Sequence, residues 1–166
     1  MLRAPKFEFE KKRMEALHRL AILDTKPEER FDWITKEAAA KFNAPMSMIS
    51  ILDKNREWYK SCQGSEATEQ KRSISFCGHA LVFHGVFLVE DTLKDARFAD
   101  NPMVVKAPFI RFYAGVALYD YQTNMPIGVF CIKDTKPRQM NADEISSLIN
   151  FAERAEKELN KSASAI

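Results

Sequence analysis

One stretch of the chain, residues 75–115, mixes reactive and charged side chains with aromatic rings. Its arginines present rigid forks of donors that suit a carboxylate or a phosphate, and its histidines can donate or accept a hydrogen bond near neutral pH. Its aromatic side chains would supply apolar walls. This mixture predicts a pocket for a small molecule that carries a negative charge or a strong acceptor together with an apolar part. The candidate ligand-binding residues are Phe76, Cys77, His79, Asp95, Phe98, Arg111 and Tyr113.

Cys77 and His79 are also the residues that could form a thiol–base pair or a metal site. They lie two positions apart, which on a helix places them roughly 200° apart and on different faces. A metal site would need further ligands, and neither Cys62 nor His84 has a spacing that brings it to them. The sequence therefore predicts no catalytic residue and no metal ligand, and it identifies no cofactor. The alternative makes Cys77 a small buried side chain at a helix start.

Arg111 opens a predicted strand, in which successive side chains point to opposite faces of the sheet. Arg111 and Tyr113 would share one face, and the apolar residues between and after them would pack under helices on the other. We therefore expect the pocket on the face of Arg111 and Tyr113, closed by residues 75–108. Two roles stay open for Arg111, because it can anchor the ligand or pair with Asp91 or Asp95 and fix the loop.

The composition limits the class of protein and its partners. The 166 residues suit one domain, which at this size buries roughly 70% of its unfolded surface. The 25 basic and 23 acidic residues are spread along the chain for a net charge of +2, so nucleic acid is not an expected partner. No apolar run approaches the roughly 20 residues that span a bilayer, and no membrane partner is expected. Three cysteines without an export signal indicate reduced thiols in a cytoplasmic protein.

Helical periodicity is found at both ends of the chain. A first helix over residues 7–23 should be followed by a second, which a capping box formed by Thr25 and Glu28 would begin. A last helix should open at residues 141–144. We expect a homodimer, formed through the apolar stripes of these terminal helices, which include Leu17, Leu20, Ile149 and Leu159.

The middle of the chain alternates strands, turns and short helices. Residues 63–72 are polar and are expected to form a mobile loop. Ser73 or Ser75 should cap a helix that ends by Gly85, and Asp95 should cap a short helix. Strands are expected at residues 46–53, 57–61, 86–89, 112–119 and 127–134. This order of elements, with hairpins between strands, predicts an α+β fold with an antiparallel sheet packed by helices.

Several short motifs occur along the chain in a fixed order. They include Glu29-Arg30-Phe31-Asp32, the strand at residues 48–53, Ser75-Phe76-Cys77-Gly78-His79-Ala80, Asp95-Ala96-Arg97-Phe98, Arg111-Phe112-Tyr113-Ala114-Gly115 and residues 127–132. Each motif is weak alone, but all of them in this order are highly specific. On these motifs, nearly the whole of residues 13–159 resembles the sensory GAF domain, of the type found alone or upstream of bacterial signalling enzymes.

The resemblance implies a six-stranded antiparallel sheet related to the PAS fold, with the terminal helices on one face and a ligand pocket on the other. It implies regulatory binding of a small molecule rather than catalysis, commonly within a homodimer. The domain would span residues 13–160, after an N-terminal extension at 1–12 and before a C-terminal tail at 161–166. The signatures of the cyclic-nucleotide and bilin-binding branches are absent, so the ligand stays unidentified.

Two alternatives to a sensory domain are open. One branch of the family consists of free methionine-(R)-sulfoxide reductases, whose Gly-Val-Cys-Gly motif is similar to Phe76-Cys77-Gly78. Their catalytic cysteine lies further along the chain, where this sequence has no cysteine, and Cys131 is expected to be a buried, inert thiol. The other alternative is a purely structural interaction module whose pocket is filled by side chains.

Overall fold

A six-stranded antiparallel sheet forms the centre of the molecule, in the strand order β3-β2-β1-β6-β5-β4. The computed structural model describes the backbone of residues 1–164 and the side chains of residues 1–161. The strands are β1 (Met46–Leu52), β2 (Arg56–Gln63), β3 (Glu69–Lys71), β4 (Val86–Val89), β5 (Phe112–Tyr119) and β6 (Pro126–Asp134). The α+β fold with a six-stranded antiparallel sheet is thereby confirmed.

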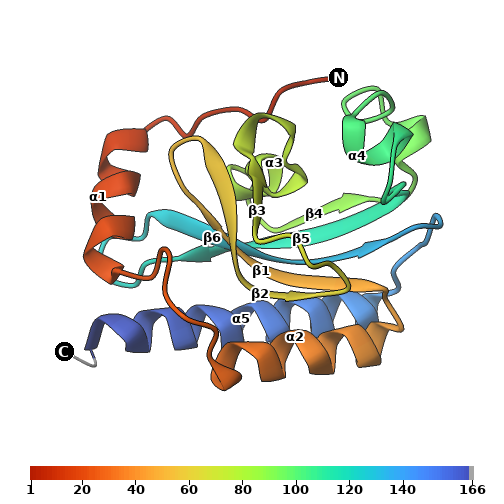
Figure 1. The fold of residues 1–166 in the computed structure, drawn as a ribbon. Helices are drawn as coiled ribbons and strands as arrows, with labels where there is room; N and C mark the ends of the chain where they lie inside the picture. The colour runs from red at the N-terminus through yellow and green to blue at the C-terminus, as the bar shows by residue number, and fades with distance from the viewer. Residues whose placement is uncertain (165–166) are drawn as a thin grey trace.

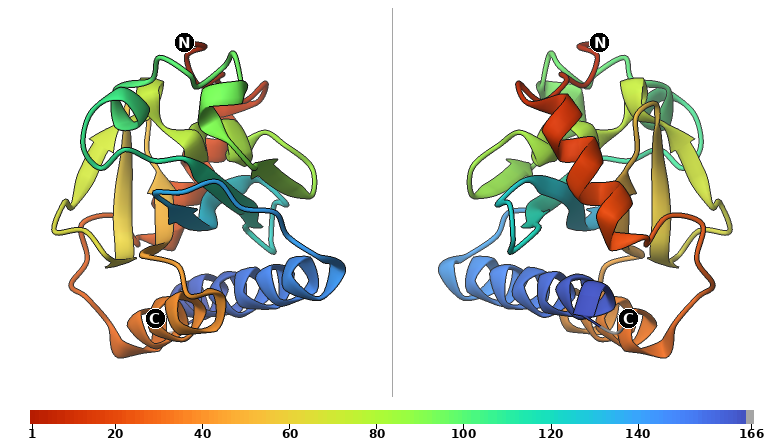
Figure 2. Two further views of the ribbon diagram at one scale, coloured as in Figure 1. Left: turned by 90° about the vertical axis from the view of Figure 1, so that its right-hand side faces the viewer. Right: turned by 90° about the vertical axis from the view of Figure 1, so that its left-hand side faces the viewer.

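The two faces of the sheet are covered by different kinds of structure. The long helices α2 (Glu29–Phe42) and α5 (Ala142–Ser164) lie side by side under one face (Figure 1). The short helices α3 (Phe76–Leu81) and α4 (Pro102–Val105) lie over the other, with the 3₁₀ turns Arg72–Ile74 and Thr92–Lys94. Helix α1 (Glu10–Leu20) crosses one end of the sheet and contacts α5 and β6 (Figure 2). No helix of the described chain is both long enough and apolar enough to cross a bilayer.

Strand alternation divides the core into two clusters, one on each face. On β5 and β6, Phe112, Ala114, Phe130 and Ile132 pack with the residues of α2 and α5. Tyr113, Val129 and Cys131 point to the other face and pack with α3. Strand β1 is buried along its whole length, as expected for a central strand that is covered on both faces.

Three local expectations are wrong. Residues 63–72 contain the edge strand β3, which pairs with β2, although their composition predicts a loop. Helix α2 begins after Glu28 without a side-chain cap, because Thr25 instead donates to the Ile22 carbonyl and accepts a hydrogen bond from Lys60. Helix α3 ends at Leu81, before the expected stop at residue 85. Tertiary partners outweighed the local signal in the first two cases.

The apolar stripes of the terminal helices are largely buried within the domain itself. Leu17, Leu20 and Leu159 belong to the core that α2 and α5 share, and only Ile149, at 37% exposure, faces outward in part. The expectation that these stripes need a second copy to cover them is therefore wrong for the first three, while the homodimer itself stays a prediction. The predicted C-terminal tail overlaps α5 up to Ser164 and otherwise, at residues 165–166, lies outside the described residues.

Candidate functional site

The aromatic residues predicted to wall a pocket pack against one another instead. The rings of Phe76 and Phe98 stack with centroids 4.4 Å apart, and Phe76 also stacks on Tyr113 at 5.3 Å. Phe87 meets both Phe98 and Tyr113 edge-on. All of these rings are buried, so they fill the space over β4 and β5.

Cys77 lies in the same cluster and contacts the thiol of Cys131, a neighbour that the spacing of the two residues in the sequence did not predict. The Tyr113 hydroxyl donates to the Cys77 Sγ at 3.0 Å, and the Sγ atoms of Cys77 and Cys131 are 3.7 Å apart. Both thiols are fully buried, and burial raises the pKa of Cys77 well above its usual value. Cys77 therefore stays protonated in this conformation and is a poor nucleophile. This contact could have been predicted from the sequence, because the alternation of side chains along β6 places Cys131 on the face of the sheet that α3 covers.

His79 secures the N-terminal segment that runs over α3. Its Nε2 lies 3.2 Å from the Leu2 carbonyl oxygen, and the same segment forms a backbone hydrogen bond from Ala4 to Ser73. Burial lowers the pKa of His79, which favours the neutral ring. In this structure His79 acts as a packing and hydrogen-bonding residue.

Asp95 and Arg111 make contacts that hold the loops around α4. Asp95 accepts hydrogen bonds from the backbone N–H and the guanidinium of Arg97, but it holds a turn and does not cap the expected short helix, because the next helix, α4, is capped by Asn101. Arg111 donates through Nη1 to the Val104 carbonyl at 2.8 Å. The alternative in which Arg111 pairs with Asp91 or Asp95 is wrong, because Asp95 is occupied by Arg97 and Asp91 accepts from the backbone of Leu93.

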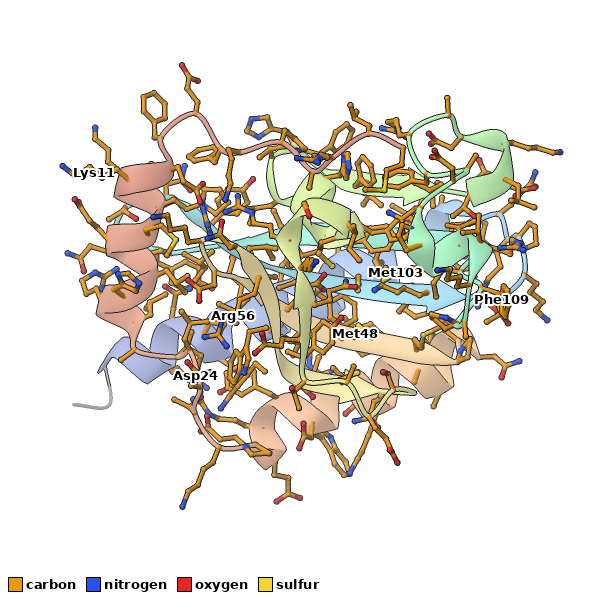
Figure 3. The ribbon with its side chains drawn as sticks, turned by 45° about the horizontal axis from the view of Figure 1, so that its top comes forward. Lys11, Asp24, Met48, Arg56, Met103 and Phe109 are labelled. Carbon is orange, nitrogen blue, oxygen red and sulfur yellow. The ribbon has the colours of Figure 1, made fainter. Side chains whose placement is uncertain are left out.

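A pocket of about 440 Å³, the sheet-face pocket, lies on the face of the sheet that α3 and α4 cover. It lies over β1, β2 and β6 and not over β4 and β5. Met48 on β1 and Met103 on α4 are two of its lining residues, and Figure 3 shows where each lies. The seven candidate residues are not part of its lining, so their role as ligand contacts stays a prediction. The pocket is lined by Met46, Met48, Tyr59, Gly64, Ser65, Ala67, Glu69, Gln70, Met103, Ala107, Pro108, Ile110 and Lys133.

Lys133 is the residue of this pocket that the sequence analysis missed. It is 2% exposed, and no hydrogen bond or ion pair joins its ammonium to another side chain or carbonyl of the described residues. The ring of Phe76 lies 6.0 Å from its Nζ. The sequence signal was the position of Lys133, which by strand alternation shares the face of Val129 and Cys131.

Glu57 is the countercharge of Lys133 in this layer of the fold. It is fully buried and accepts hydrogen bonds from the hydroxyls of Ser50 and Ser75 and from the amide of Gln70. Burial on its own would lower the pKa of Lys133, but the Glu57 carboxylate raises it above the ordinary value. Lys133 therefore carries a positive charge at neutral pH without a direct partner.

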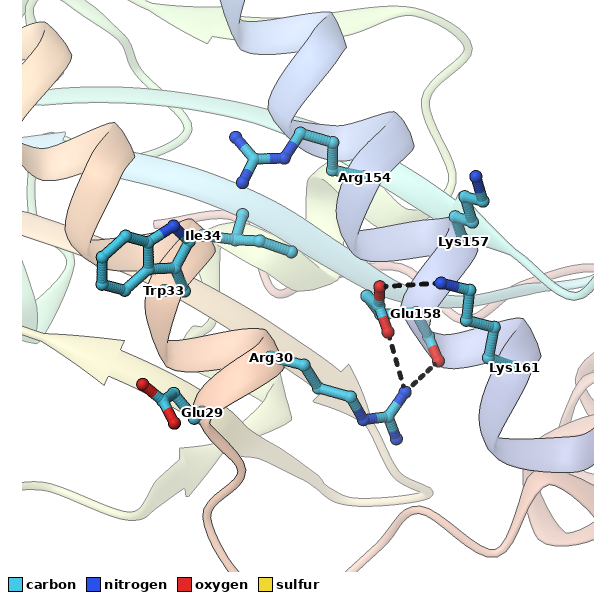
Figure 4. Close-up of a pocket in the computed structure, with 8 residues that line it drawn as sticks. All are labelled: Glu29, Arg30, Trp33, Ile34, Arg154, Lys157, Glu158 and Lys161. Carbon is cyan, nitrogen blue, oxygen red and sulfur yellow. Dashed lines mark hydrogen bonds and ion pairs between the residues drawn. The ribbon is translucent and has the colours of Figure 1, made fainter. Parts of the chain in front are cut away.

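A second hollow, of about 600 Å³, is an open groove between α2 and α5 on the outer surface (Figure 4). Three of its ionic side chains, Arg30, Glu158 and Lys161, form ion pairs with one another. Glu158 accepts from Arg30 at 3.1 Å and from Lys161 at 3.2 Å (Figure 4). Arg154 pairs at 2.8 Å with Glu37, which is not part of the lining. Trp33, at 57% exposure, is the large apolar side chain of this groove. An open groove is less suited to enclose a small molecule than the sheet-face pocket is.

No group of three or more His, Cys, Asp or Glu side chains in the described part of the chain is arranged to hold a metal ion. The side chains that converge on this pocket are three thioethers, the Tyr59 phenol, the Ser65 hydroxyl, the Gln70 amide, the Lys133 ammonium and the Glu69 carboxylate, which pairs with Arg56. Such a set suits an organic ligand with one polar end.

Comparison with known proteins places this geometry in a family. The sequence model of the GAF domain matches residues 26–159. The chain is 36% identical over 153 residues to the cyclic di-GMP phosphodiesterase PA2567 of Pseudomonas aeruginosa, a match that covers 92% of this chain and 26% of that protein. The chain thus spans about a quarter of that relative's length.

Solved structures share the fold at low sequence identity. The GAF domain of an Acinetobacter phosphoenolpyruvate-protein phosphotransferase superposes with a TM-score of 0.64 at 14% identity, covering 92% of this chain and 96% of that one. The free methionine-R-sulfoxide reductase of Neisseria meningitidis gives 0.63 at 18% identity, covering 100% and 99%. The PixJ GAF domain of Thermosynechococcus elongatus gives 0.63 at 14% identity, covering 89% of each chain. Together with the match over residues 26–159, this shows that the chain belongs to the GAF domain family, whose members are typically regulatory or sensory ligand-binding modules.

Proposed function

We propose that this chain is a sensory domain that binds a small molecule with an anionic group in the sheet-face pocket and does not itself catalyse a reaction. The observation that carries the proposal is Lys133, a buried and charged ammonium that lines the pocket without a direct hydrogen-bonding partner among the described residues. A buried charge is costly unless it is paired, so a ligand that supplies an acceptor there gains a charge-assisted hydrogen bond.

The rest of the pocket favours a ligand with an apolar body. Met46, Met48 and Met103 contribute flexible thioether side chains, and Ile110 closes the same wall. Methionine adapts its shape to irregular partners, which suits a pocket that opens and closes on a small molecule. A carboxylate or a phosphate at Lys133, with an apolar part against the methionines, satisfies both halves of the pocket.

The pocket is closed by segments that can report occupancy to the rest of the protein. Helix α4 and residues 107–110 lie over one side, and residues 64–70, which include the first two residues of β3, lie over the other. A ligand that contacts both would change their relative stability. The likeness to PA2567, a cyclic di-GMP phosphodiesterase, supports a place for this domain within signal transduction. We also propose that the protein is cytoplasmic and that it forms a homodimer.

The reductase alternative is less well supported. Cys77 and Cys131 do converge, but both are buried behind Tyr113 and outside the lining of the sheet-face pocket. Burial also raises the pKa of Cys62, the partly exposed thiol, to about 11. None of these thiols is primed to attack a substrate held against Lys133.

The test compares hexanoate with its neutral counterpart hexanamide, by calorimetric titration of the wild-type protein and of Lys133→Met. Lys133 should give hexanoate a charge-assisted hydrogen bond of about 1.5–3 kcal/mol, or roughly ten- to a hundred-fold in affinity. Lys133→Met should remove that preference, and Lys36→Met, on the exposed surface of α2, should keep it.

Native mass spectrometry of the purified protein gives a second measurement. The wild type should carry a small-molecule mass that Lys133→Met lacks. The proposal is overturned if hexanamide binds the wild type as tightly as hexanoate does, or if Lys133→Met retains both the bound mass and the preference.

A further inference from the structure

Two buried guanidinium groups share one carboxylate beneath the N-terminal segment. Arg13 is fully buried and Arg72 is 2% exposed, and both donate to Glu10. Burial alone would raise the pKa of Glu10, but the two guanidinium groups lower it to about 2. Their remaining hydrogen bonds include three to the carbonyls of Leu52, Asp53 and Lys54, which carry no formal charge. This buried cluster therefore holds one more positive charge than negative.

A hollow of about 510 Å³ lies against this cluster. Four of its lining residues are basic and none is acidic: it is lined by Arg3, Ala4, Lys6, Asn55, Lys71, Arg72 and Ser73. The side chains of Arg3, Asn55, Lys71 and Ser73 make no hydrogen bond or ion pair within the described structure, so their polar groups are available to a ligand.

Arg72 also has a polar atom that no described residue satisfies. Its Nε is buried and has no hydrogen-bond partner in the described structure, one of two such side-chain atoms. Buried donors in native proteins nearly always have a partner, so a donor that the protein leaves unsatisfied favours a site that an acceptor group would complete. Lys6, beside it, has a pKa lowered first by its burial and next by the charge of Arg72, which reflects the positive potential of the hollow.

We propose that this hollow binds the phosphate group of a phosphorylated small molecule, with Arg72 as the buried anchor and Lys6 and Lys71 as exposed partners. Phosphate has several acceptor oxygens, which match the arginine forks, the ammonium groups, the Asn55 amide and the Ser73 hydroxyl. The hollow is larger than a phosphate ion needs, so it also has space for an organic part.

This site is independent of the sheet-face pocket. The two share no lining residue, although β3 contributes Glu69 and Gln70 to one and Lys71 to the other. A ligand at either site thus contacts the same short strand. A protein that fails to bind a ligand at one site can still bind one at the other.

The experiment titrates the protein with phenyl phosphate and with inorganic phosphate, and follows backbone amide shifts by NMR. Saturable shifts are expected around Arg72 and Ser73. The double variant Lys6→Gln/Lys71→Gln should weaken binding about tenfold or more, because both lost groups are cationic and exposed. The matched control Lys36→Gln/Lys41→Gln removes the same charge from the surface of α2 and should bind as the wild type does.

Sedimentation with phosphatidylcholine vesicles, with and without phosphatidic acid, distinguishes a free phosphorylated ligand from a lipid headgroup. Binding of phenyl phosphate in solution supports a free phosphorylated ligand. Binding only to the vesicles that contain phosphatidic acid, lost in the lysine double variant, supports a lipid headgroup. The proposal is overturned if neither probe binds, if an oligonucleotide binds where phenyl phosphate does not, or if both double variants lose affinity equally.

Discussion

Two buried lysines lie on opposite sides of the central sheet, and they differ in how their charge is satisfied. Lys60, on the side of α2, donates to the Thr25 hydroxyl at 2.8 Å and the Lys26 carbonyl at 2.6 Å, and it pairs with Glu28 at 2.7 Å. Lys133, on the side of α3 and α4, has no direct partner in the described structure. An ammonium whose three donors are all used has a structural role, whereas one without partners in a pocket is available to a ligand.

The coverings of the two faces explain this difference. Long helices satisfy their own backbone groups, so α2 and α5 can pack an apolar core tightly against the sheet. Short helices and loops leave backbone groups that side chains must satisfy, and Ser75, Asp91 and Asn101 do so at the starts of α3, the Thr92–Lys94 turn and α4. Such a layer fits the sheet less completely, and the 440 Å³ pocket remains beneath it.

The largest expected change in the free energy of unfolding comes from a substitution in the tightly packed core under α2 and α5, compared with one beside the sheet-face pocket. Phe130 is fully buried and stacks on Phe151 at 5.9 Å between centroids, so Phe130→Ala should cost about 3–5 kcal/mol of unfolding free energy. Met103 is half-buried and borders an existing hollow, so Met103→Ala should cost less than about 2 kcal/mol. Urea denaturation measures both, and equal losses would contradict the difference in packing.

A smaller effect is expected from the two lysines themselves. Lys60→Met should lower the free energy of unfolding by about 2–3 kcal/mol, because it removes hydrogen bonds to a charged donor. Lys133→Met removes no direct hydrogen bond but takes away the countercharge of buried Glu57, so it should cost less than Lys60→Met does, about 1 kcal/mol. Thermal melts of both variants test this. A Lys133→Met protein that is as unstable as Lys60→Met would make Lys133 a structural residue.

The smallest effect concerns the helix caps on the loop-covered face. The Ser75 hydroxyl accepts from the Gly78 N–H at 2.9 Å, so Ser75→Ala should cost about 1 kcal/mol or slightly more, since the same hydroxyl also donates to Glu57. The control is Ser73→Ala, which removes a hydroxyl that makes no hydrogen bond in the described structure and should stay within about 0.5 kcal/mol of wild type. Chemical denaturation with matched buffers resolves this difference.

The sequence was informative where the signal is local. Alternation along residues 112–119 assigned Phe112 and Ala114 to the helix-covered face and Tyr113 to the other, as the structure has them. Ser75 was one of the two serines considered as the cap of α3, and it is the cap. These assignments depend on neighbours a few residues apart, whose geometry follows from the backbone period.

The ligand site was less predictable, because it depends on which side chains fill the space over the sheet. Phe76, Phe98 and Tyr113 were expected to line a cavity, and they fill it by stacking. The space that stays open lies over β1, β2 and β6, where methionines leave room beside Lys133. A cavity is what remains after all neighbouring volumes are packed, so the residue types of one segment do not locate it.

The sequence alone determined the class of fold, the order of most elements and the family, because periodicity and ordered motifs are properties of the chain itself. Only the tertiary structure decided which charges meet. It brought Lys133 near Glu57, Cys77 to Cys131, and Arg72 to Glu10 across 62 positions. Whether a buried charge is paired depends on these long-range contacts, and that pairing separates a structural lysine from one that can hold a ligand.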